Sequence, residues 1–294
     1  MNFIQSGILI ANKPYQWTSN DVIRKIKSNF KFKKIGHAGT LDPLATGILP
    51  ILVNDATKYF DYFQNFKKSY LAEIKFGIST TSYDLEGEID EETDKLPENL
   101  EKIKEIIPFF LGSIKQVPPK YSAIKKNGKR LYEYARNDED IEIEPREVVV
   151  SDIKIISWKT PVLKLIISCS SGFYVRSFAN DLAKKLKSLG VLISLSRINY
   201  GPFNINDSIN IQNIYELEKK LIAIDSLFLS NNKLVFDIET EQSYFNGAVF
   251  SSENLKLSLL KEQEIKIYNI NDKFIGLLTF DKNKKFWKPK NIIR

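Results

Sequence analysis

The chain has 294 residues, 43% of them hydrophobic, which is enough for a folded core and argues against a disordered polypeptide. Its net charge of +7 weakly favours a polyanionic partner. Cys169 and His37 are its only cysteine and histidine, which excludes an intrachain disulfide and a Cys/His zinc site. No apolar run approaches the roughly 20 residues of a membrane-spanning helix, which excludes a helical membrane anchor.

The first eighty residues predict a strand, a helix, a loop and two further apolar segments. Ser19 or Asn20 begins the helix, because a short polar side chain at the N-cap accepts hydrogen bonds from free backbone N–H groups. Alternating apolar and polar side chains predict a strand with one polar face at Tyr70–Phe76. The other segments are a strand at Gly7–Ala11, a loop at Gly36–Gly47 and an apolar run at Ile48–Val53.

The second half predicts more strands and two helices, and its texture changes near residue 231. Short strand-like runs then alternate with Asn, Asp and Gly turns, which indicates a small all-β module. The elements expected before it are strands at Val148–Ile156, Val162–Cys169 and Phe173–Val175, a helix with Phe178 and Leu182 on one face, and a shorter helix near Ile214–Leu221.

Charge is distributed unevenly along the chain. Residues 1–83 carry 11 Lys and Arg against 5 Asp and Glu, whereas residues 84–105 carry 10 acidic residues against 3 basic ones. The last 14 residues carry six basic groups and one acidic group. A nucleic-acid groove and an ordinary solvated lysine-rich surface explain this distribution equally well.

The loop Gly36–Gly47 is the most unusual segment, with three glycines and one proline in twelve residues. Such a composition does not form a regular element. Pro43 pushes Asp42 toward an extended conformation, and Leu41 and Leu44 can anchor the loop on either side. On spacing alone, Asp42 is an ordinary turn or N-cap aspartate.

The string GHAGTLDPLATGILPI in this loop resembles the catalytic motif of the bacterial tRNA pseudouridine-55 synthases, the TruB-type family. Further motifs of that family follow in order over about the first 200 residues. Departures at Gln16, Ser79 and Thr81 bear on RNA contacts more than on chemistry. The matching segments are Lys13–Asp21, Lys68–Tyr70, Thr80–Gly87, Pro119–Lys125, Leu131–Arg136, Ser171–Arg176 and Leu195–Arg197.

The resemblance implies an α+β fold with a mixed, mainly antiparallel sheet and flanking helices. It divides the chain into a catalytic pseudouridine synthase domain at 1–230 and a small PUA-like RNA-binding β module at 231–294. The C-terminal match is the weaker one, and it rests on Asn246–Gly247 and Lys273–Gly276.

The resemblance also implies the reaction: isomerisation of uridine 55 in the T loop of tRNA to pseudouridine, by base flipping and an aspartate. This chemistry changes no oxidation state, so no cofactor and no metal are expected, although an all-carboxylate magnesium site stays open on composition alone. We expect tRNA, through its T arm, as the partner, with no membrane and no obligate protein partner. The chain is expected to act as a monomer in the cytoplasm, and its N-terminus lacks the pattern of a secretion signal.

Three residues are assigned to catalysis by the resemblance. Asp42 attacks C1′ or C6, or deprotonates C2′; the sequence does not choose among these. Arg176 pairs with Asp42 and holds it ionised, because a nearby positive charge lowers a carboxyl pKa. Tyr70 stacks on the flipped uracil and can accept a proton; a half-buried strand aromatic is the alternative.

The remaining site residues are assigned to substrate binding. Tyr174 and Leu195 line the uracil pocket, with core packing as the alternative. Lys13 supports the pocket or contacts phosphate, with a solvated lysine as the alternative. His37 stacks in the space that the uridine leaves, with a buried structural histidine as the alternative. The residues expected to meet RNA phosphates are Lys125, Lys126, Lys129 and Arg130, with Lys284, Lys285, Lys288 and Lys290 as further candidates.

Three other functions are compatible with parts of the sequence. A non-catalytic RNA-binding protein would share the basic surface but not the joint presence of Asp42, Tyr70 and Arg176. A guide-RNA-dependent synthase would need partner proteins, and the short C-terminal module favours the stand-alone type. A carboxylate glycoside hydrolase would need a second catalytic carboxylate.

Overall fold

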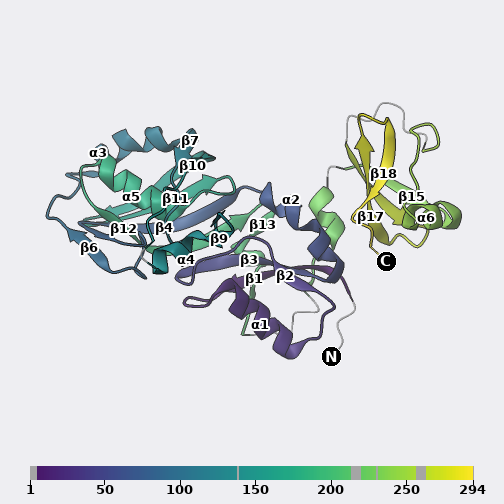
Figure 1. Cartoon of the computed structure of the whole chain (residues 1–294), viewed down its shortest axis with the longest axis horizontal. Helices are drawn as coiled ribbons and strands as arrows, with labels where there is room; N and C mark the ends of the chain where they lie inside the picture. The colour runs from purple at the N-terminus through teal and green to yellow at the C-terminus, as the bar shows by residue number, and fades with distance from the viewer. Residues whose placement is uncertain (1–4, 138, 213–219, 230, 256–262, 294) are drawn as a thin grey trace.

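The computed structural model describes residues 5–137, 139–212, 220–229, 231–255 and 263–293. A large sheet with its helices forms the body of the molecule, and a smaller C-terminal sheet lies beside one end of it (Figure 1). The short helix expected near Ile214–Leu221 falls mainly outside the described residues.

The large sheet has ten strands, in the order β14-β1-β3-β12-β4-β11-β10-β7, with β13 beside β12 and β2 beside β3. In the described part of the chain, β1 and β14 are parallel, as are β3 and β12, and the other pairs of this sheet are antiparallel. The prediction of a mixed, mainly antiparallel sheet is therefore confirmed. Its strands are β1 Gly7–Lys13, β2 Ile35–His37, β3 Ala45–Val53, β4 Lys68–Phe76, β7 Gly112–Gln116, β10 Arg146–Lys159, β11 Val162–Cys169, β12 Gly190–Tyr200, β13 Phe203–Asn204 and β14 Ile209–Asn210.

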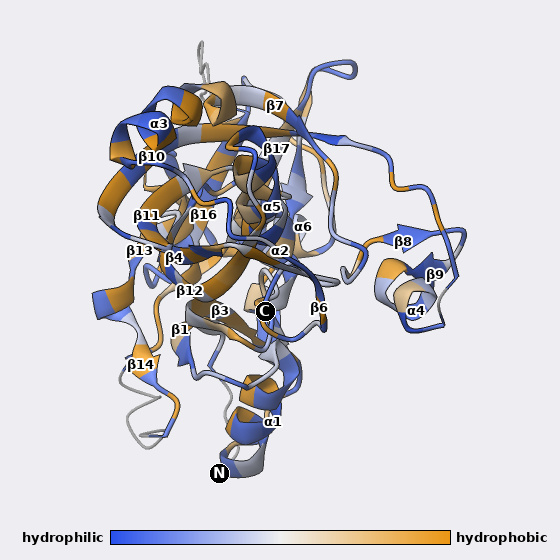
Figure 2. Cartoon of the chain, turned by 90° about the vertical axis from the view of Figure 1, so that its left-hand side faces the viewer, coloured by the Kyte–Doolittle hydropathy of each residue, from blue (hydrophilic) through white to orange (hydrophobic). Residues whose placement is uncertain are grey.

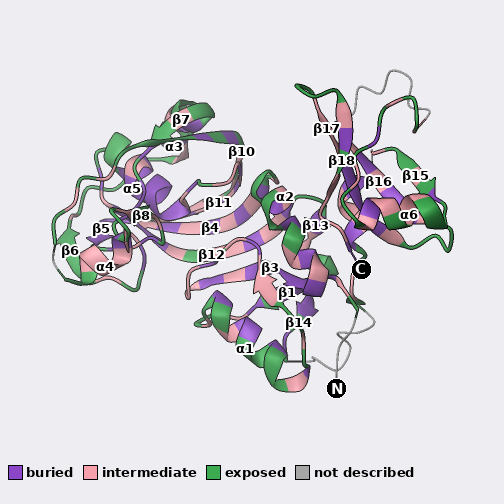
Figure 3. Ribbon diagram, turned by 45° about the vertical axis from the view of Figure 1, so that its right-hand side comes forward, coloured by how far each residue is buried: buried purple, intermediate pink, exposed green. Residues whose placement is uncertain are grey.

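Helices flank the sheet and seal its apolar faces. Phe178 and Leu182 of α5 pack with β4, β11 and β12 in the largest hydrophobic cluster, while Val22 and Ile26 of α1 pack on β1 and β3. Buried and half-buried residues alternate along the central strands β4 and β11 (Figure 3). The helices are α1 Ser19–Asn29, α2 Phe60–Gln64, α3 Leu100–Ile106, α4 Leu131–Arg136, α5 Val175–Lys185 and α6 Ile238–Phe245, with 3-10 turns at Asn54–Tyr59, Ile107–Phe110, Ile205–Asp207 and Ile224–Phe228.

Local sequence signals explain where these elements start. Helix α1 is capped by Thr18, one residue before the predicted cap, because its hydroxyl accepts from the backbone N–H of Asp21 while the Asp21 carboxylate accepts from Thr18. Strand β4 alternates buried and half-buried residues along its whole length, as predicted. This alternation places Lys68 and Tyr70 on the same buried face.

The prediction of a strand at Phe173–Val175 is wrong, because helix α5 already begins at Val175. The chain turns at Gly172, where φ is +85°, and the side chain of Gln116 then holds Tyr174. Its amide nitrogen donates to the Tyr174 carbonyl at 3.0 Å, and its amide oxygen accepts from the Tyr174 N–H at 2.8 Å. Arg176 therefore lies in the first turn of a helix instead of at the end of a strand.

Two small hairpins extend from the body. One pairs β5 Ile78–Thr80 with β6 Ile89–Glu92, and the other pairs β8 Lys125–Lys126 with β9 Lys129–Arg130. The β8–β9 hairpin and α4 project to one side of the molecule (Figure 2).

The C-terminal sheet has the order β15-β16-β17-β18, with strands at Lys233–Phe236, Glu264–Asn269, Phe274–Asp281 and Phe286–Lys290. It is not all-β as predicted, because α6 packs Tyr244 into its core. Leu277 and Ile293 enter a cluster with Ile8 and Tyr59 of the body, and the Tyr59 hydroxyl donates to the Asn291 carbonyl at 2.8 Å. The two sheets thus share part of a hydrophobic core.

Among the described residues, no helix combines the length and apolar character needed to cross a membrane.

Candidate active site

A cavity of about 880 Å³ opens in the wall of the body, within the size range of ligand pockets. It is bounded by the loop that carries Asp42, by β4, by the start of α5 and by the β8–β9 hairpin. The residues expected at the site that line it are His37, Asp42, Tyr70, Lys125, Arg130, Tyr174, Arg176 and Leu195.

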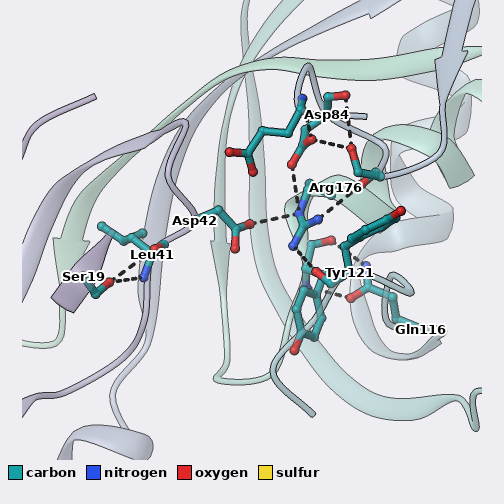
Figure 4. A network of polar contacts seen from close by, with 10 residues as sticks. Ser19, Leu41, Asp42, Asp84, Gln116, Tyr121 and Arg176 are labelled. Atoms are coloured by element: carbon teal, nitrogen blue, oxygen red, sulfur yellow. Dashed lines mark hydrogen bonds and ion pairs between the residues drawn. The ribbon is translucent and has the colours of Figure 1, made fainter. Parts of the chain in front are cut away.

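The loop carrying Asp42 is held from both sides. The Ser19 hydroxyl accepts from the Leu41 N–H at 3.0 Å and lies 3.2 Å from the Leu41 carbonyl oxygen, as Figure 4 shows. After the aspartate, the Lys13 ammonium donates to the Pro43 carbonyl at 3.0 Å. At Gly47, φ is +97° and a Cβ atom would stand 2.3 Å from the Arg197 carbonyl oxygen, so only glycine lets the loop enter β3 here.

Arg176 is the centre of the polar network (Figure 4). Its Nε lies 2.9 Å from Oδ2 of Asp42 and 3.5 Å from Oδ2 of Asp84. Its terminal nitrogens donate to the carbonyls of Ser82 at 3.2 Å and Tyr121 at 2.9 Å. The side chains of Arg176 and Asp84 are each 5% exposed, whereas that of Asp42 is 40% exposed. The buried arginine therefore fixes the carboxylate that faces the cavity.

The Asp42 carboxyl has a raised pKa. The largest cause is desolvation by the protein that surrounds the cavity, although the carboxylate itself faces that cavity; the Arg176 guanidinium opposes the rise, and the negative charge of Asp84 adds to it. The expected ion pair is present, and the Arg176 charge lowers the pKa of Asp42, as expected of a nearby cation, against the opposing effect of desolvation. The arginine limits the rise of the pKa instead of reversing it.

Aromatic and apolar side chains form the walls beside Asp42. Tyr70 comes from β4, Tyr174 from the residue before α5 and Leu195 from β12. Burial raises the pKa values of both tyrosines, so their hydroxyls stay protonated at neutral pH. Flat aromatic faces beside a carboxylate suit a planar base.

His37 lies at the cavity edge at the end of β2. Burial, followed by the charge of Arg197, lowers its pKa, so the ring is neutral at neutral pH. Its Nδ1 atom is buried without a hydrogen-bond partner in the described part of the chain. A neutral ring at the cavity edge is suited to stacking.

Lys13 does not line the cavity. It is fully buried, and its ammonium donates to the carbonyls of Pro14, Trp17 and Pro43. Burial lowers its pKa to about 8. The side chain therefore has the supporting position that was expected as one alternative, behind the loop of Asp42.

The basic residues of the β8–β9 hairpin differ in whether they line the cavity. Lys125 and Arg130 line the cavity, whereas Lys126 and Lys129 do not. Lys129 pairs with Glu139 at 2.6 Å, and the Lys126 ammonium donates to the Glu142 carbonyl at 2.6 Å. The exposed Lys129–Glu139 ion pair is weak, and the Lys126 contact is a single exposed hydrogen bond to a backbone carbonyl, so neither withdraws its lysine from other partners.

Several site residues were not identified from the sequence. Asp84 stands in the Thr80–Gly87 motif and Arg197 in the Leu195–Arg197 motif, so the signal existed without an assigned role. Arg197 donates to the carbonyls of Ile48 at 2.7 Å and Gly39 at 2.8 Å, beneath the loop. Gln116 lies outside every motif, and only the structure connects it to the site.

Comparison with known proteins agrees with this architecture. The chain matches a Cbf5–Nop10–Gar1 complex structure with a TM-score of 0.70 at 19% identity, covering 98% of this chain and 84% of that one. A structure of an H/ACA RNP bound to a substrate RNA gives a TM-score of 0.68 at 18% identity, covering 98% and 84%. These likenesses concern the fold.

Several proteins share more sequence identity with this chain than these two structures do. The chain is 39% identical to the tRNA pseudouridine synthase B of Clostridium kluyveri over 273 residues, 92% of this chain and 94% of that one. It is 46% identical to the protein of the same name from Ureaplasma urealyticum serovar 10, covering 74% and 95%, and 37% identical to that of Francisella philomiragia, covering 95% and 92%. The family model described as TruB family pseudouridylate synthase, N-terminal domain, matches residues 27–175.

Fold, site and relatives together define a pseudouridine synthase, an isomerase. More particularly, the chain belongs to the TruB family, as its motifs indicated.

Proposed function

We propose that this protein converts uridine 55 in the T loop of tRNA to pseudouridine. The relatives are named tRNA pseudouridine synthase B, which supports tRNA as the substrate class. The observation that carries the proposal is the pair of Asp42 and Arg176, with a partly exposed carboxylate held 2.9 Å from a buried guanidinium at the cavity wall.

The reaction breaks the bond from C1′ to N1, rotates the uracil and joins C1′ to C5. The proton on C5 leaves and N1 gains one, so product and substrate are isomers and no electrons are exchanged. Asp42 serves as the carboxylate that attacks C1′ or C6, or that removes the C2′ proton. A primary kinetic isotope effect with deuterium at C2′ distinguishes the last route from the two attacks.

The aromatic walls suit a base that has left its stack. Extrusion of a nucleotide costs a few kcal/mol of unstacking, which contacts in the pocket must return. In the proposal Tyr70 stacks on the uracil, Tyr174 and Leu195 enclose it, and His37 stacks in the vacated space. Because the Tyr70 hydroxyl stays protonated, it can accept the C5 proton only by passing its own proton onward.

We infer two units: a catalytic domain at 1–230 and a PUA-like RNA-binding module at 231–294. The separate C-terminal sheet and the change of sequence texture near residue 231 support this division. In this proposal the T arm binds across the cavity, and the chain works as a monomer without a protein partner.

The test is to incubate the purified chain with unmodified tRNA and to map pseudouridine by base-specific chemical labelling. The expected result is modification at position 55 with no other RNA or protein added. Modification at another position would refute the target, and activity that appears only with an added guide RNA would favour the guide-dependent mechanism.

A further inference from the structure

Lys68 is a buried cation in the cavity wall that the proposed chemistry does not use. It opens β4 and is 6% exposed. Tyr70 follows on the same face, with the two Cα atoms about 7 Å apart by the rise of a strand. The Lys68 ammonium donates to the Ser171 hydroxyl and lies 4.7 Å from the centre of the Tyr200 ring.

No carboxylate balances this charge. In the described part of the chain, Lys68 forms no ion pair, and the main charged group acting on it is Arg197, another cation. Burial, followed by the Arg197 charge, lowers its pKa to about 8. A buried cation without an anion is costly, because protein contacts replace its lost hydration only in part.

The rest of the cavity wall has the same imbalance. Lys125, Arg130 and Arg197 also line it without a carboxylate partner among the described residues, while Asp42 and Asp84 are both engaged by Arg176. The part of the wall around Lys68 is therefore electropositive, since the Asp42 carboxylate of the same cavity is paired with Arg176 and is not among the groups that act on Lys68. An anionic ligand would supply what the protein leaves out.

We propose that Lys68 and Ser171 form a binding site for one phosphate of the RNA backbone next to the flipped uridine. The inference rests on the proposed function, since it assumes that RNA enters this cavity. An ammonium and a hydroxyl are donors suited to phosphate oxygens. Ser171 also donates to the Gln64 carbonyl in the free protein, and this hydroxyl turns to the phosphate when RNA binds.

A uracil carbonyl is the competing ligand for the same ammonium. It is neutral and would leave the buried charge uncompensated, which is why the phosphate is favoured. Single phosphates can be made neutral without altering the base, so the two ligands are separable by experiment.

The experiment measures equilibrium binding of a T-arm stem-loop RNA to wild type, Lys68→Met and Lys68→Arg. Each phosphate flanking the target uridine is replaced in turn by a neutral methylphosphonate. Lys75→Met is the matched control, because it removes the same charge from the same strand on the other face. Circular dichroism confirms that each variant is folded. Ser171→Ala is a second variant that is combined with the same phosphate replacements.

In Lys68→Met, binding should weaken about tenfold and the slope of log K against log salt should fall by about one, while Lys68→Arg and Lys75→Met stay near wild type. One of the two methylphosphonates should weaken RNA binding by wild type by a similar factor and should cause no further loss of affinity in Lys68→Met. Ser171→Ala should itself bind the unmodified RNA more weakly than wild type, by a smaller factor than Lys68→Met. Its loss and that of the same methylphosphonate should likewise not add up. Additive losses at both phosphates, or unchanged affinity in Lys68→Met, would overturn the proposal. Pseudouridine formation by the same wild-type sample on unmodified RNA tests the proposed function separately.

Discussion

Arg176 holds Asp42 through its Nε atom at 2.9 Å, although one residue belongs to a helix and the other to a glycine-rich loop. The same guanidinium is anchored by Asp84 and by two backbone carbonyls. The position of the Asp42 carboxylate thus depends on several distant segments.

Replacement of Asp42 tests the central chemical assignment. Asp42→Asn should abolish isomerisation while tRNA binding stays within about tenfold, or ~1.4 kcal/mol, of wild type, because many other contacts bind the RNA. The measurements are single-turnover pseudouridine formation and RNA affinity. Asp61→Asn removes an exposed carboxylate and serves as the control. Measurable pseudouridine from Asp42→Asn would reject the residue as essential.

Replacement of Asp84 tests the support of Arg176. Asp84→Asn keeps the side-chain shape and can still accept from the Ser82 hydroxyl and the Glu86 N–H. It loses the charge that holds Arg176, so kcat should fall, by up to about a hundredfold for a small misplacement, with little change in KM. Glu88→Gln, which removes an exposed carboxylate from the same segment, is the control. A selective rise in KM would contradict a positioning role.

The pH profile follows from the raised pKa of Asp42. The proposed mechanism uses the ionised form of this carboxylate, so kcat/KM should fall as the pH drops through that raised value. Because the charge of Asp84 raises the pKa of Asp42, Asp84→Asn should move the acidic limb to lower pH. Residual activity of the variant is enough to measure the limb. A limb that stays in place or moves to higher pH is inconsistent with this coupling.

Metal independence is expected because the isomerisation needs no Lewis acid. In the presence of EDTA, turnover on prefolded tRNA should continue at the rate measured without EDTA. The control adds EDTA to unfolded tRNA, where loss of magnesium impairs the RNA itself. Loss of turnover on prefolded tRNA that zinc alone restores would disprove the prediction.

The C-terminal lysines are expected to add affinity without choosing the base. Deleting residues 231–294 is a poor test, because Leu277 and Ile293 share a core with Ile8 and Tyr59. The triple change of Lys282, Lys284 and Lys285 to Gln leaves that core intact. The triple variant should have a higher KM than wild type, and the slope of its log K against log salt should be smaller by about two to three. The modified position should stay unchanged.

The matched control changes Lys95, Lys102 and Lys104, which lie in the acidic segment, to Gln. Equal salt slopes for the C-terminal variant and wild type would leave the tail without an electrostatic role. Modification at a new uridine would show that the tail helps to select the target.

Elements whose signals are local were predictable from the chain alone. The alternation in β4, the apolar run in β3 and the capping of α1 each depend on neighbours a few residues apart, so their patterns were readable to within a few residues. The motif around Asp42 likewise identified the family, because its residues are contiguous. The strand predicted at Phe173–Val175 failed for the opposite reason: Gln116, which holds Tyr174 at the start of α5, lies far away in the chain.

The arrangement of the site depends on contacts between segments that are distant in the chain. The tertiary structure placed Lys13 behind the loop on three carbonyls, brought Asp84 and Tyr121 to Arg176, and buried Lys68 without an anionic partner among the described residues. It also brought the charges of Arg176 and Asp84, which shift the pKa of Asp42 in opposite directions, to one point. Burial and charge at a point in space are sums over every segment that packs there, and no local pattern in the chain contains those sums.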